Sequence, residues 1–289
     1  MACATEVFNA GSYRFDLGRK TYVMGIINVT PDSFSDGGRF LSSDDALRQA
    51  ERMVQCGVDI IDIGGESTRP GFVPVSVQEE IDRVVPVIER ICRQLPVPVS
   101  IDSRKSATAA AAIQAGAVIV NDITGLREDP DMAGMIAGTR AGVIMMHHAG
   151  LSPELLTEEE RQLDRLDWSS RMTHYLRLSI QKAIDCGIER TRLMTDPGIG
   201  FHMTPDESIQ ALRQCACLRS LGLPFLVGTS RKRLISHILG GRPVEERLMG
   251  TAATVCYAIT AGADFVRVHD VAETDTVRVM DALYRERSL

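Results

Sequence analysis

Arg267 and His269 stand two residues apart in the string FVRVHD near the end of the chain. Alternate residues of a β-strand point to the same face, so both side chains would face one site. An Arg side chain on a buried face needs an anionic partner, because an unpaired charge there is costly. Two partners stay open: an aspartate of the same chain, in an internal ion pair, or an oxyanion that Arg267 binds with two hydrogen bonds and His269 with a third.

Two further polar side chains could reach the same oxyanion. Arg69 lies in the loop string GGESTRPG, and Asn28 ends the apolar run VMGIIN. An Asn side chain offers a neutral carbonyl oxygen, which suits one protein ligand of a Mg²⁺ ion that keeps most of its water. Arginine, histidine, an amide and Mg²⁺ together favour a phosphate group over a carboxylate as the anion. The predicted cofactor is therefore Mg²⁺.

Acidic and amide side chains end three other apolar runs, at Asp102, Asn121 and Asp196. Their oxygens suit a ligand edge with several N–H donors, such as an amino-pyrimidinone ring. A divalent-metal carboxylate cage and a pair for general acid–base catalysis are the alternatives. Lys232, in GTSRK, is a natural counterion, because two crowded carboxylates would otherwise raise the pKa of one of them. Met146 would supply an apolar floor for a flat ring.

Other polar residues near these positions are assigned to structure. Adjacent strand residues face opposite sides, so Asp122 should be a structural cap, and His147 and His148 should be ordinary rim residues and not metal ligands. Arg231 and Arg233 should point to solvent. No GxGxxG or GxxxxGK[ST] string marks a nucleotide cofactor.

The side chains together predict a planar nitrogen heterocycle bound deep in the site with a phosphate group beside it. Two long polar segments, 31–42 and 65–76, carry several Gly, Ser and Thr residues and could close over a second reactant. Ordinary solvated loops are the alternative for both. We interpret the arrangement as a transferase with a phosphate leaving group, in preference to a hydrolase or an oxidoreductase.

Eight short apolar runs must position these side chains, and each leads into a polar or charged residue. A buried parallel strand is apolar on both faces, so polar residues cluster where the strand emerges. Helical patterns separate the runs, which predicts an α/β fold, a (β/α)₈ TIM barrel with its chemistry at the carboxyl rim. The runs lie at 23–29, 59–65, 97–103, 118–123, 143–146, 193–196, 225–230 and 265–268, and the helical patterns at about 43–56, 77–94, 105–115, 131–138, 170–187, 205–221, 245–262 and 271–286.

The first residues carry a different pattern. Residues 7–20 alternate weakly around a Gly turn, which predicts a short N-terminal β-hairpin that closes the barrel floor. No linker or composition shift divides the rest. We therefore expect residues 1–20 as a hairpin cap and 21–289 as a single barrel domain, with Asp44 and Ser76 as candidate helix N-caps.

Composition narrows the function classes. The formal net charge of −6 argues against a nucleic-acid partner or an anionic membrane surface. The seven cysteines form no CxxC pair, which favours reduced thiols over a disulfide framework or a zinc site. No run approaches the ~18 apolar residues of a membrane span, and the start has no signal-peptide pattern. The expectation is a soluble cytoplasmic protein with small-molecule substrates.

Seven strings of this chain resemble the dihydropteroate synthases of bacterial folate synthesis, within the pterin-binding enzyme family. They are NVTPDSFSDGG (28–38), GGESTRPG (64–71), SIDSRK (100–105), NDI (121–123), DPGIGF (196–201), VGTSRK (227–232) and RVHD (267–270). The likeness covers about residues 21–287, in order and at suitable spacing. The two loop strings are highly specific.

This resemblance implies a barrel, usually a homodimer, that joins 6-hydroxymethyl-7,8-dihydropterin diphosphate to p-aminobenzoate and releases diphosphate and 7,8-dihydropteroate. Asp102, Asn121, Asp196 and Lys232 match the pterin-binding positions; Thr68, Arg267 and His269 match those on the diphosphate, and Asn28 the Mg²⁺ ligand. Phe34, Arg69 and Pro70 fall on the loops of the p-aminobenzoate pocket, where sulfonamides would compete, and Asp36 matches a carboxylate that stabilises the cationic pterin.

One string departs from the family pattern. After DPGIGF many relatives continue with a small residue and Lys, whereas this chain has His202-Met203-Thr204-Pro205. The shape of the wall there, and sulfonamide sensitivity with it, stay open. The rival functions are a pterin-binding methyltransferase, which would not call for the diphosphate-binding cations, and a non-catalytic pterin-binding barrel, which would not need Asp36, Arg69 or Lys232.

Overall fold

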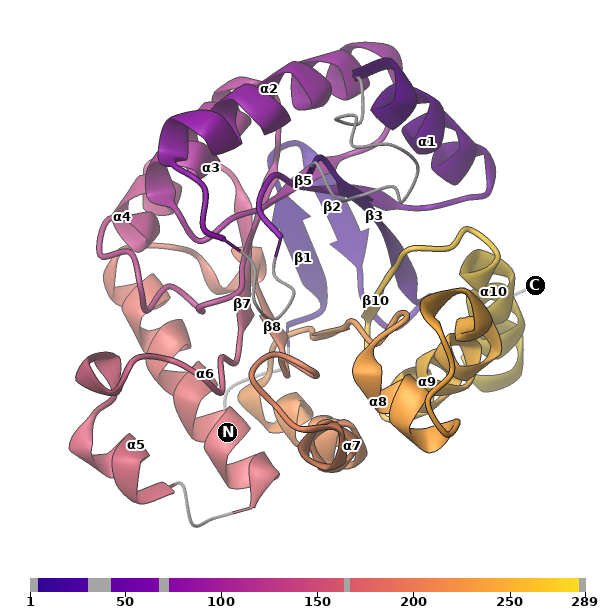
Figure 1. The fold of residues 1–289 in the computed structure, drawn as a ribbon. Coiled ribbons are helices and arrows are strands. Elements are labelled where there is room, and N and C mark those ends of the chain that lie inside the picture. The colour runs from indigo at the N-terminus through magenta and orange to yellow at the C-terminus, as the bar shows by residue number, and fades with distance from the viewer. Residues whose placement is uncertain (1–4, 31–42, 68–72, 164–166, 286–289) are drawn as a thin grey trace.

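The computed structural model describes residues 5–30, 43–67, 73–163 and 167–285. Eight parallel strands form one sheet in the order β8-β7-β6-β5-β4-β3-β10-β9. The two edge strands approach each other, since Thr195 of β8 bridges to Phe225, the residue before β9. The sheet is therefore a nearly closed barrel with helices around it (Figure 1), as the sequence predicted.

The strands coincide with the eight apolar runs. They are β3 (Tyr22–Asn28), β4 (Ile60–Gly64), β5 (Val99–Asp102), β6 (Ile119–Asp122), β7 (Gly142–Met146), β8 (Leu193–Asp196), β9 (Leu226–Val227) and β10 (Phe265–Val268). Every residue of β4 and of β7 is buried, as expected for strands covered on both faces.

The helices follow the predicted pattern with a few differences. They are α1 (Ser43–Gln55), α2 (Val77–Gln94), α3 (Ser106–Gln114), α4 (Met132–Ala137), α5 (Glu158–Leu163), α6 (Trp168–Asp185), α7 (Pro205–Gln214), α8 (Arg233–Ile238), α9 (Leu248–Thr260) and α10 (Glu273–Tyr284). The short helices α5 and α8 were not predicted, because two turns carry too little periodicity to recognise. The pattern at 205–221 divides into α7 and a 3₁₀ segment, Cys215–Leu221.

The two candidate N-caps have different outcomes. Ser76 caps α2, and its hydroxyl accepts the backbone N–H of Glu79 at 3.1 Å. Asp44 was wrong as a cap, because it lies inside the first turn of α1 and forms an ion pair with Arg90. Its carboxylate there suits the positive end of the helix dipole.

The predicted hairpin is confirmed as β1 (Val7–Ala10) paired antiparallel with β2 (Tyr13–Asp16). Phe8 and Phe15 belong to a buried cluster with residues from the amino-terminal halves of seven barrel strands, Met24, Ile60, Ile119, Ile144, Met194, Leu226 and Phe265. Gly142 lets the hairpin approach closely, since a Cβ there would lie 2.6 Å from Cζ of Phe8. The hairpin therefore closes the barrel floor and leaves the carboxyl rim as the open end.

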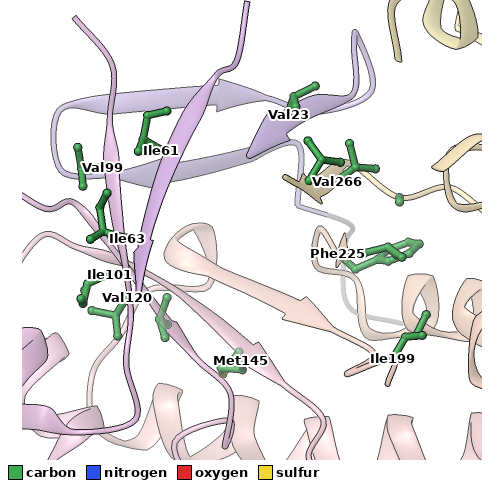
Figure 2. Close-up of a cluster of buried hydrophobic side chains, with 14 of the residues drawn as sticks. Val23, Ile61, Ile63, Val99, Ile101, Val120, Met145, Ile199, Phe225 and Val266 are labelled. Carbon is green, nitrogen blue, oxygen red and sulfur yellow. The ribbon is translucent and has the colours of Figure 1, made fainter. Parts of the chain in front are cut away.

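The main core lies between the barrel and its helices. Outward-facing strand residues such as Ile61, Ile63 and Val99 pack there (Figure 2). Because side chains alternate along a strand, Asp62 between the two isoleucines faces the barrel interior. Within the described residues, no helix is long and apolar enough to cross a membrane.

Candidate active site

The centre of the barrel mouth is a buried ion-pair cluster around Arg267 of β10. Its Nε donates to Oδ2 of Asp62 on β4 at 2.6 Å, and one terminal nitrogen donates to Oδ2 of Asp102 on β5 at 2.6 Å. Nδ2 of Asn121, from β6, donates to the same Asp62 oxygen at 3.2 Å. Of the two partners that the sequence left open for Arg267, the internal ion pair is present in this structure.

Asp62 is the member of this cluster that sequence reasoning missed. The predicted site residues stand at the ends of the apolar runs, whereas Asp62 lies in the middle of DIIDIGG and is fully buried. A single charge inside an apolar strand was the available signal, because a buried charge is strongly destabilising unless it has a partner inside the barrel. Its Oδ1 has no hydrogen-bond partner among the described residues. That oxygen is suited to accept an N–H group of a ligand.

Burial shifts the protonation of the two rim carboxylates. Removal from water raises the pKa of Asp102, Arg267 opposes the rise, and the negative charge of Asp62 adds to it. The pKa of Asp196 is also raised by burial, against the opposing charge of Lys232. Oδ1 of Asp196 accepts the backbone N–H of Gly198 at 2.7 Å. Both groups are therefore poised to exchange hydrogen bonds with a polar ring.

Lys232 lies at the start of α8, beside the Asp196 side of the mouth. Its Nζ donates to the backbone oxygen of Ile199 and lies 4.6 Å from the ring centroid of Phe201. Burial lowers the pKa of Lys232 to about 8, and Asp196 opposes that shift. Lys232 is thus held over the segment that follows β8, and it acts on Asp196 through its charge, with no direct ion pair described between them.

His269 follows β10 and is neutral. Burial lowers its pKa to about 3, and the positive charge of Arg267 adds to the effect. Its Nδ1 has no hydrogen-bond partner among the described residues. A neutral imidazole has one N–H donor and one acceptor, so His269 can supply the single donor that the sequence assigned to it.

The remaining described candidates border the same mouth. Asn28, Gly64 and Asp102 are register partners on three neighbouring strands. Gly64 has no side chain, and its ideal Cβ position lies 3.3 Å from Oδ1 of Asn28 and 3.9 Å from Oδ2 of Asp102. Met146 ends β7, is register partner of Asp196 and is buried. Phe34, Asp36, Thr68, Arg69 and Pro70 lie outside the described residues, so their roles stay predictions.

The structural roles predicted for Asp122 and Arg231 have different outcomes. Asp122 is confirmed as a cap, since its carboxylate accepts the backbone N–H groups of Thr124 and Leu126 at 2.8 Å each. The prediction that Arg231 points to solvent was wrong, because its guanidinium binds both oxygens of Asp270. Arg231 follows β9 and Asp270 follows the neighbouring strand β10, and this proximity is not visible in the sequence alone.

His147 and His148 have different surroundings. His147 is buried, and its ring packs edge-on against Tyr175 at 5.1 Å. The ring of His148 lies 4.7 Å from that of His202. Burial lowers the pKa of His147 to about 3 and that of His148 to about 4. Across the described ranges, no group of three or more His, Cys, Asp or Glu side chains could hold a metal ion.

Residues 24–269 match the family of pterin binding enzymes, a span that runs from within β3 past the end of β10 and contains the complete ion-pair cluster.

The chain belongs to the pterin-binding enzyme family.

Relatives within the pterin-binding enzyme family are similar over nearly the whole chain. A dihydropteroate synthase of Synechocystis is 45% identical over 276 residues, which are 95% of this chain and 94% of that protein. The dihydropteroate synthase of Clostridium difficile, solved in the presence of pteroic acid, is 42% identical with a TM-score of 0.86 and covers 94% of this chain and 100% of its own. The Yersinia pestis enzyme, solved with a sulfonamide drug complex, is 37% identical with a TM-score of 0.84 and covers 96% and 98%.

Proposed function

We propose that this pterin-binding enzyme is a dihydropteroate synthase. It joins 6-hydroxymethyl-7,8-dihydropterin diphosphate to p-aminobenzoate and yields 7,8-dihydropteroate and diphosphate. The observation that carries the proposal is the mouth itself, where the guanidinium of Arg267 stands between buried carboxylates from β4 and β5. The similarity over the full length to enzymes of that name supports the same reaction. A methyltransferase or a non-catalytic barrel has no observation in its favour.

The acidic side of the mouth suits the pterin ring. Asp102, Asn121 and Asp196 come from three different strand ends, and Asp62 offers an unpartnered oxygen below them. A pterin presents a row of N–H donors and one carbonyl group, which carboxylates and an amide can satisfy together. The pKa values of Asp102 and Asp196 are raised because burial disfavours their ionised forms, and a ligand that donates hydrogen bonds to them would stabilise those forms.

The cationic side suits the diphosphate. Arg267 uses its Nε and one terminal nitrogen on Asp62 and Asp102, and the five N–H donors of a guanidinium leave others for a phosphate oxygen. The aspartates therefore orient the guanidinium and leave N–H donors for an oxyanion, so Arg267 can take part in the ion pair and bind the diphosphate at the same time. His269 adds a neutral donor two residues further along.

Charge placed at opposite ends of the reacting bond favours an ionising displacement. When the diphosphate leaves, positive charge develops on the pterin methylene carbon and ring, close to the carboxylates, and negative charge develops next to Arg267. The amine of p-aminobenzoate is a weak nucleophile and gains from attacking this electrophile in an oriented site. The attacking nitrogen then loses its proton. Asp36, Thr68 and Arg69 on the two loops are predicted to stabilise the cation and the leaving group, and Phe34, Arg69 and Pro70 to bound the p-aminobenzoate pocket, where sulfonamides compete.

Mg²⁺ is the cofactor that we propose, with Asn28 as its protein ligand. The fit rests on the position of the Asn28 amide oxygen, which lies 3.3 Å from the ideal Cβ position of Gly64, with an Asp102 oxygen 3.9 Å from the same position. One or two protein oxygens are sufficient, because Mg²⁺ usually keeps several waters and takes its other ligands from substrate phosphates. The ion supplies charge neutralisation of the diphosphate.

A homodimer in the cytoplasm is the proposed form of the enzyme. Large exposed apolar side chains gather on α8, α9 and α10, which lie together on one side of the barrel (Figure 1): Ile238, Leu239, Leu248, Met249, Tyr257, Val279, Leu283 and Tyr284. A monomer rarely leaves such a patch in water, and a second copy of the same face is its proposed occupant. The six described cysteines are free thiols, which suit a reducing compartment.

Diphosphate release tests the proposed function. The purified protein is incubated with pterin diphosphate and Mg²⁺, with and without p-aminobenzoate. We expect 7,8-dihydropteroate and one equivalent of diphosphate only when both substrates are present, apart from slow release by water. No diphosphate in either mixture would exclude the synthase.

A further inference from the structure

Arg231 lies in the loop that carries Lys232 and contacts the loop that carries His269. Its backbone is in an unusual conformation. It directly precedes Lys232, and its φ is +59°. That left-handed region favours glycine, because a Cβ crowds the following carbonyl oxygen. Among the described residues, only Leu126 and His202 are other non-glycine residues with positive φ. A residue with a long side chain keeps this conformation only where its surroundings impose it.

Those surroundings bind Arg231 on three sides. Its backbone N–H donates to Oγ1 of the buried Thr251 at 3.1 Å, and its backbone oxygen accepts a guanidinium N–H of Arg247 at 2.9 Å. Its own guanidinium donates through Nε to Oδ2 of Asp270 at 2.7 Å and through a terminal nitrogen to Oδ1. Both the backbone and the side chain of Arg231 are therefore fixed.

The partner Asp270 directly follows His269. A second contact joins the same two loops, because the hydroxyl of Ser230 accepts the backbone N–H of His269 at 3.2 Å. Strands β9 and β10 pair at only two positions, Phe265 with Leu226 and Val266 with Val227. Beyond that short ladder, the side-chain contacts of Ser230 and Arg231 are what set the distance between the two loops.

The ion pair is partly exposed, with 38% of the Arg231 side chain and 23% of the Asp270 side chain accessible. A bidentate geometry makes such a pair stronger than most exposed ion pairs, but the left-handed backbone of Arg231 is itself unfavourable and offsets part of that gain. The residues next to the pair in sequence, Lys232 and His269, both lie within electrostatic reach of Arg267 at the mouth. The ion pair between Arg231 and Asp270 therefore links the backbone next to Lys232 with the backbone next to His269.

We propose that Arg231 is a positioning residue, which through Asp270 fixes Lys232 and His269 relative to each other for binding of the pterin diphosphate. The inference rests on the proposed function and adds to it a pair that touches no substrate. Bidentate geometry is essential to the role, because a single bond would let the two loops rotate. Misplacement of a binding group by about 1 Å can lower a rate as much as a hundredfold.

A double-mutant cycle tests the pair: Arg231→Met, Asp270→Asn and both together. We expect each single variant to lower kcat/KM for pterin diphosphate about tenfold or more, chiefly through a higher KM, and the double variant to lose no more than either single variant. Losses that multiply in the double variant would mean that the two residues act separately, which overturns the proposal. So would an unchanged kcat/KM in both single variants.

Two further variants separate position from charge. Arg231→Lys keeps the positive charge but cannot make two parallel hydrogen bonds, so we expect it to be impaired like Arg231→Met. Full activity of Arg231→Lys would refute the positioning role. Arg242→Met is the matched control, because Arg242 forms an exposed ion pair with Glu246 between α8 and α9, away from the mouth. If Arg231→Met does not fold, Asp270→Asn and Arg231→Lys carry the same comparison.

A readout independent of catalysis distinguishes failure of this inference from failure of the proposed function. The chain has four lysines, so ¹³C-dimethylated Lys232 can be followed by NMR. Asp196, Arg267 and Asp102 are the charged groups that act on Lys232. We expect Lys232 to titrate near pH 8 in the wild type and at higher pH in the Arg231 and Asp270 variants, where it gains water. An unshifted titration contradicts the positioning role, whereas a shift in a protein that releases no diphosphate contradicts only the synthase.

Discussion

Arg267 is central to the electrostatics of the site, because one side chain binds two carboxylates and faces the proposed leaving group. Asp62 and Asp102 each accept a hydrogen bond from its guanidinium, and Asn121 donates to Asp62. Removing it would leave two buried carboxylates without their counterion, which costs more than the lost contacts alone. At the scale of single residues, the proposed function therefore depends on Arg267, Asp62 and Asp102 together, because the charge of each is stabilised by the others.

The first prediction concerns Arg267 itself. Arg267→Ala should lower kcat/KM, with a loss of about 2–4 kcal/mol of transition-state stabilisation, as expected for removal of a buried charged donor. Steady-state kinetics with both substrates measure this, and thermal unfolding shows whether the variant still folds. An unchanged kcat/KM would contradict the oxyanion site.

A second prediction separates the two substrates. Asp196→Asn keeps the shape of the side chain but removes its charge, so the pterin should bind more weakly while p-aminobenzoate is affected less. Calorimetry on each ligand gives the two affinities. The opposite order would show that Asp196 belongs to the p-aminobenzoate side.

Helix starts supply much of the local order around the mouth. α7 begins with a complete capping box, in which the Thr204 hydroxyl accepts the N–H of Glu207 at 3.2 Å and the Glu207 carboxylate accepts the N–H of Thr204 at 2.7 Å. Pro205 occupies the first helical position, where no N–H is needed. The departure from the family pattern after DPGIGF thus builds a well-capped helix.

Thr204→Ala should consequently lower the free energy of unfolding by about 1 kcal/mol. The activity should stay close to that of the wild type, because the hydrogen bonds of Thr204 among the described residues all go to the helix it caps. Urea denaturation with a parallel diphosphate assay measures both. A large loss of activity at unchanged stability would assign the departing segment to the substrate site.

Glu273, in the first turn of α10, predicts a pH effect. The residue is 1% exposed, and burial raises the pKa of its carboxyl group to about 8, with Asp270 adding to the rise. Between its unfolded pKa near 4.5 and about 8, the folded state holds a proton that the unfolded state has released, so this group's contribution to stability falls as pH rises through that window.

Glu273→Gln removes this titration. The difference in melting temperature between the wild type and Glu273→Gln should therefore change from pH 5 to pH 8. The melting temperature of the wild type should fall relative to that of Glu273→Gln as pH rises. Thermal unfolding of both proteins at matched pH values measures it, and effects of the histidines cancel in the difference. A constant difference would mean that Glu273 is ionised when folded.

The whole molecule presents two ends with separate tasks. The hairpin β1–β2 closes the amino end with Phe8 and Phe15, and the carboxyl end is left for chemistry. Helices α8 to α10 add a side with exposed apolar residues, including Met249 at 80% and Leu283 at 79% exposure. Stability, chemistry and the proposed self-association thus occupy different surfaces.

The fifth prediction is that Met249→Glu with Leu283→Glu yields a monomer. Charges placed on both sides of a symmetric interface repel their counterparts, so sedimentation should show about half the mass of the wild-type assembly. Glu substitution at exposed Leu155, which lies away from this side, is the control. A monomeric wild type would refute the homodimer.

Much of the architecture followed from local pattern. Apolar runs that end in polar residues predicted every strand, and the weak alternation at 7–20 predicted the hairpin. Asp102, Asn121 and Asp196 were identified because each ends a run, and Asp122 was correctly separated from Asn121 because neighbours on a strand face opposite sides. Short helices such as α5 and α8 escaped notice, since two turns show little periodicity.

The pairing of these side chains required the folded chain. Arg267 meets Asp62 and Asp102 across 205 and 165 residues of sequence, and Arg231 meets Asp270 across 39. Sequence alone determined which strands exist, which of their residues are polar, and the family to which those strings belong, because periodicity and composition are local properties. Which charge neutralises which was decided only by tertiary structure, because strand register and barrel closure set those distances.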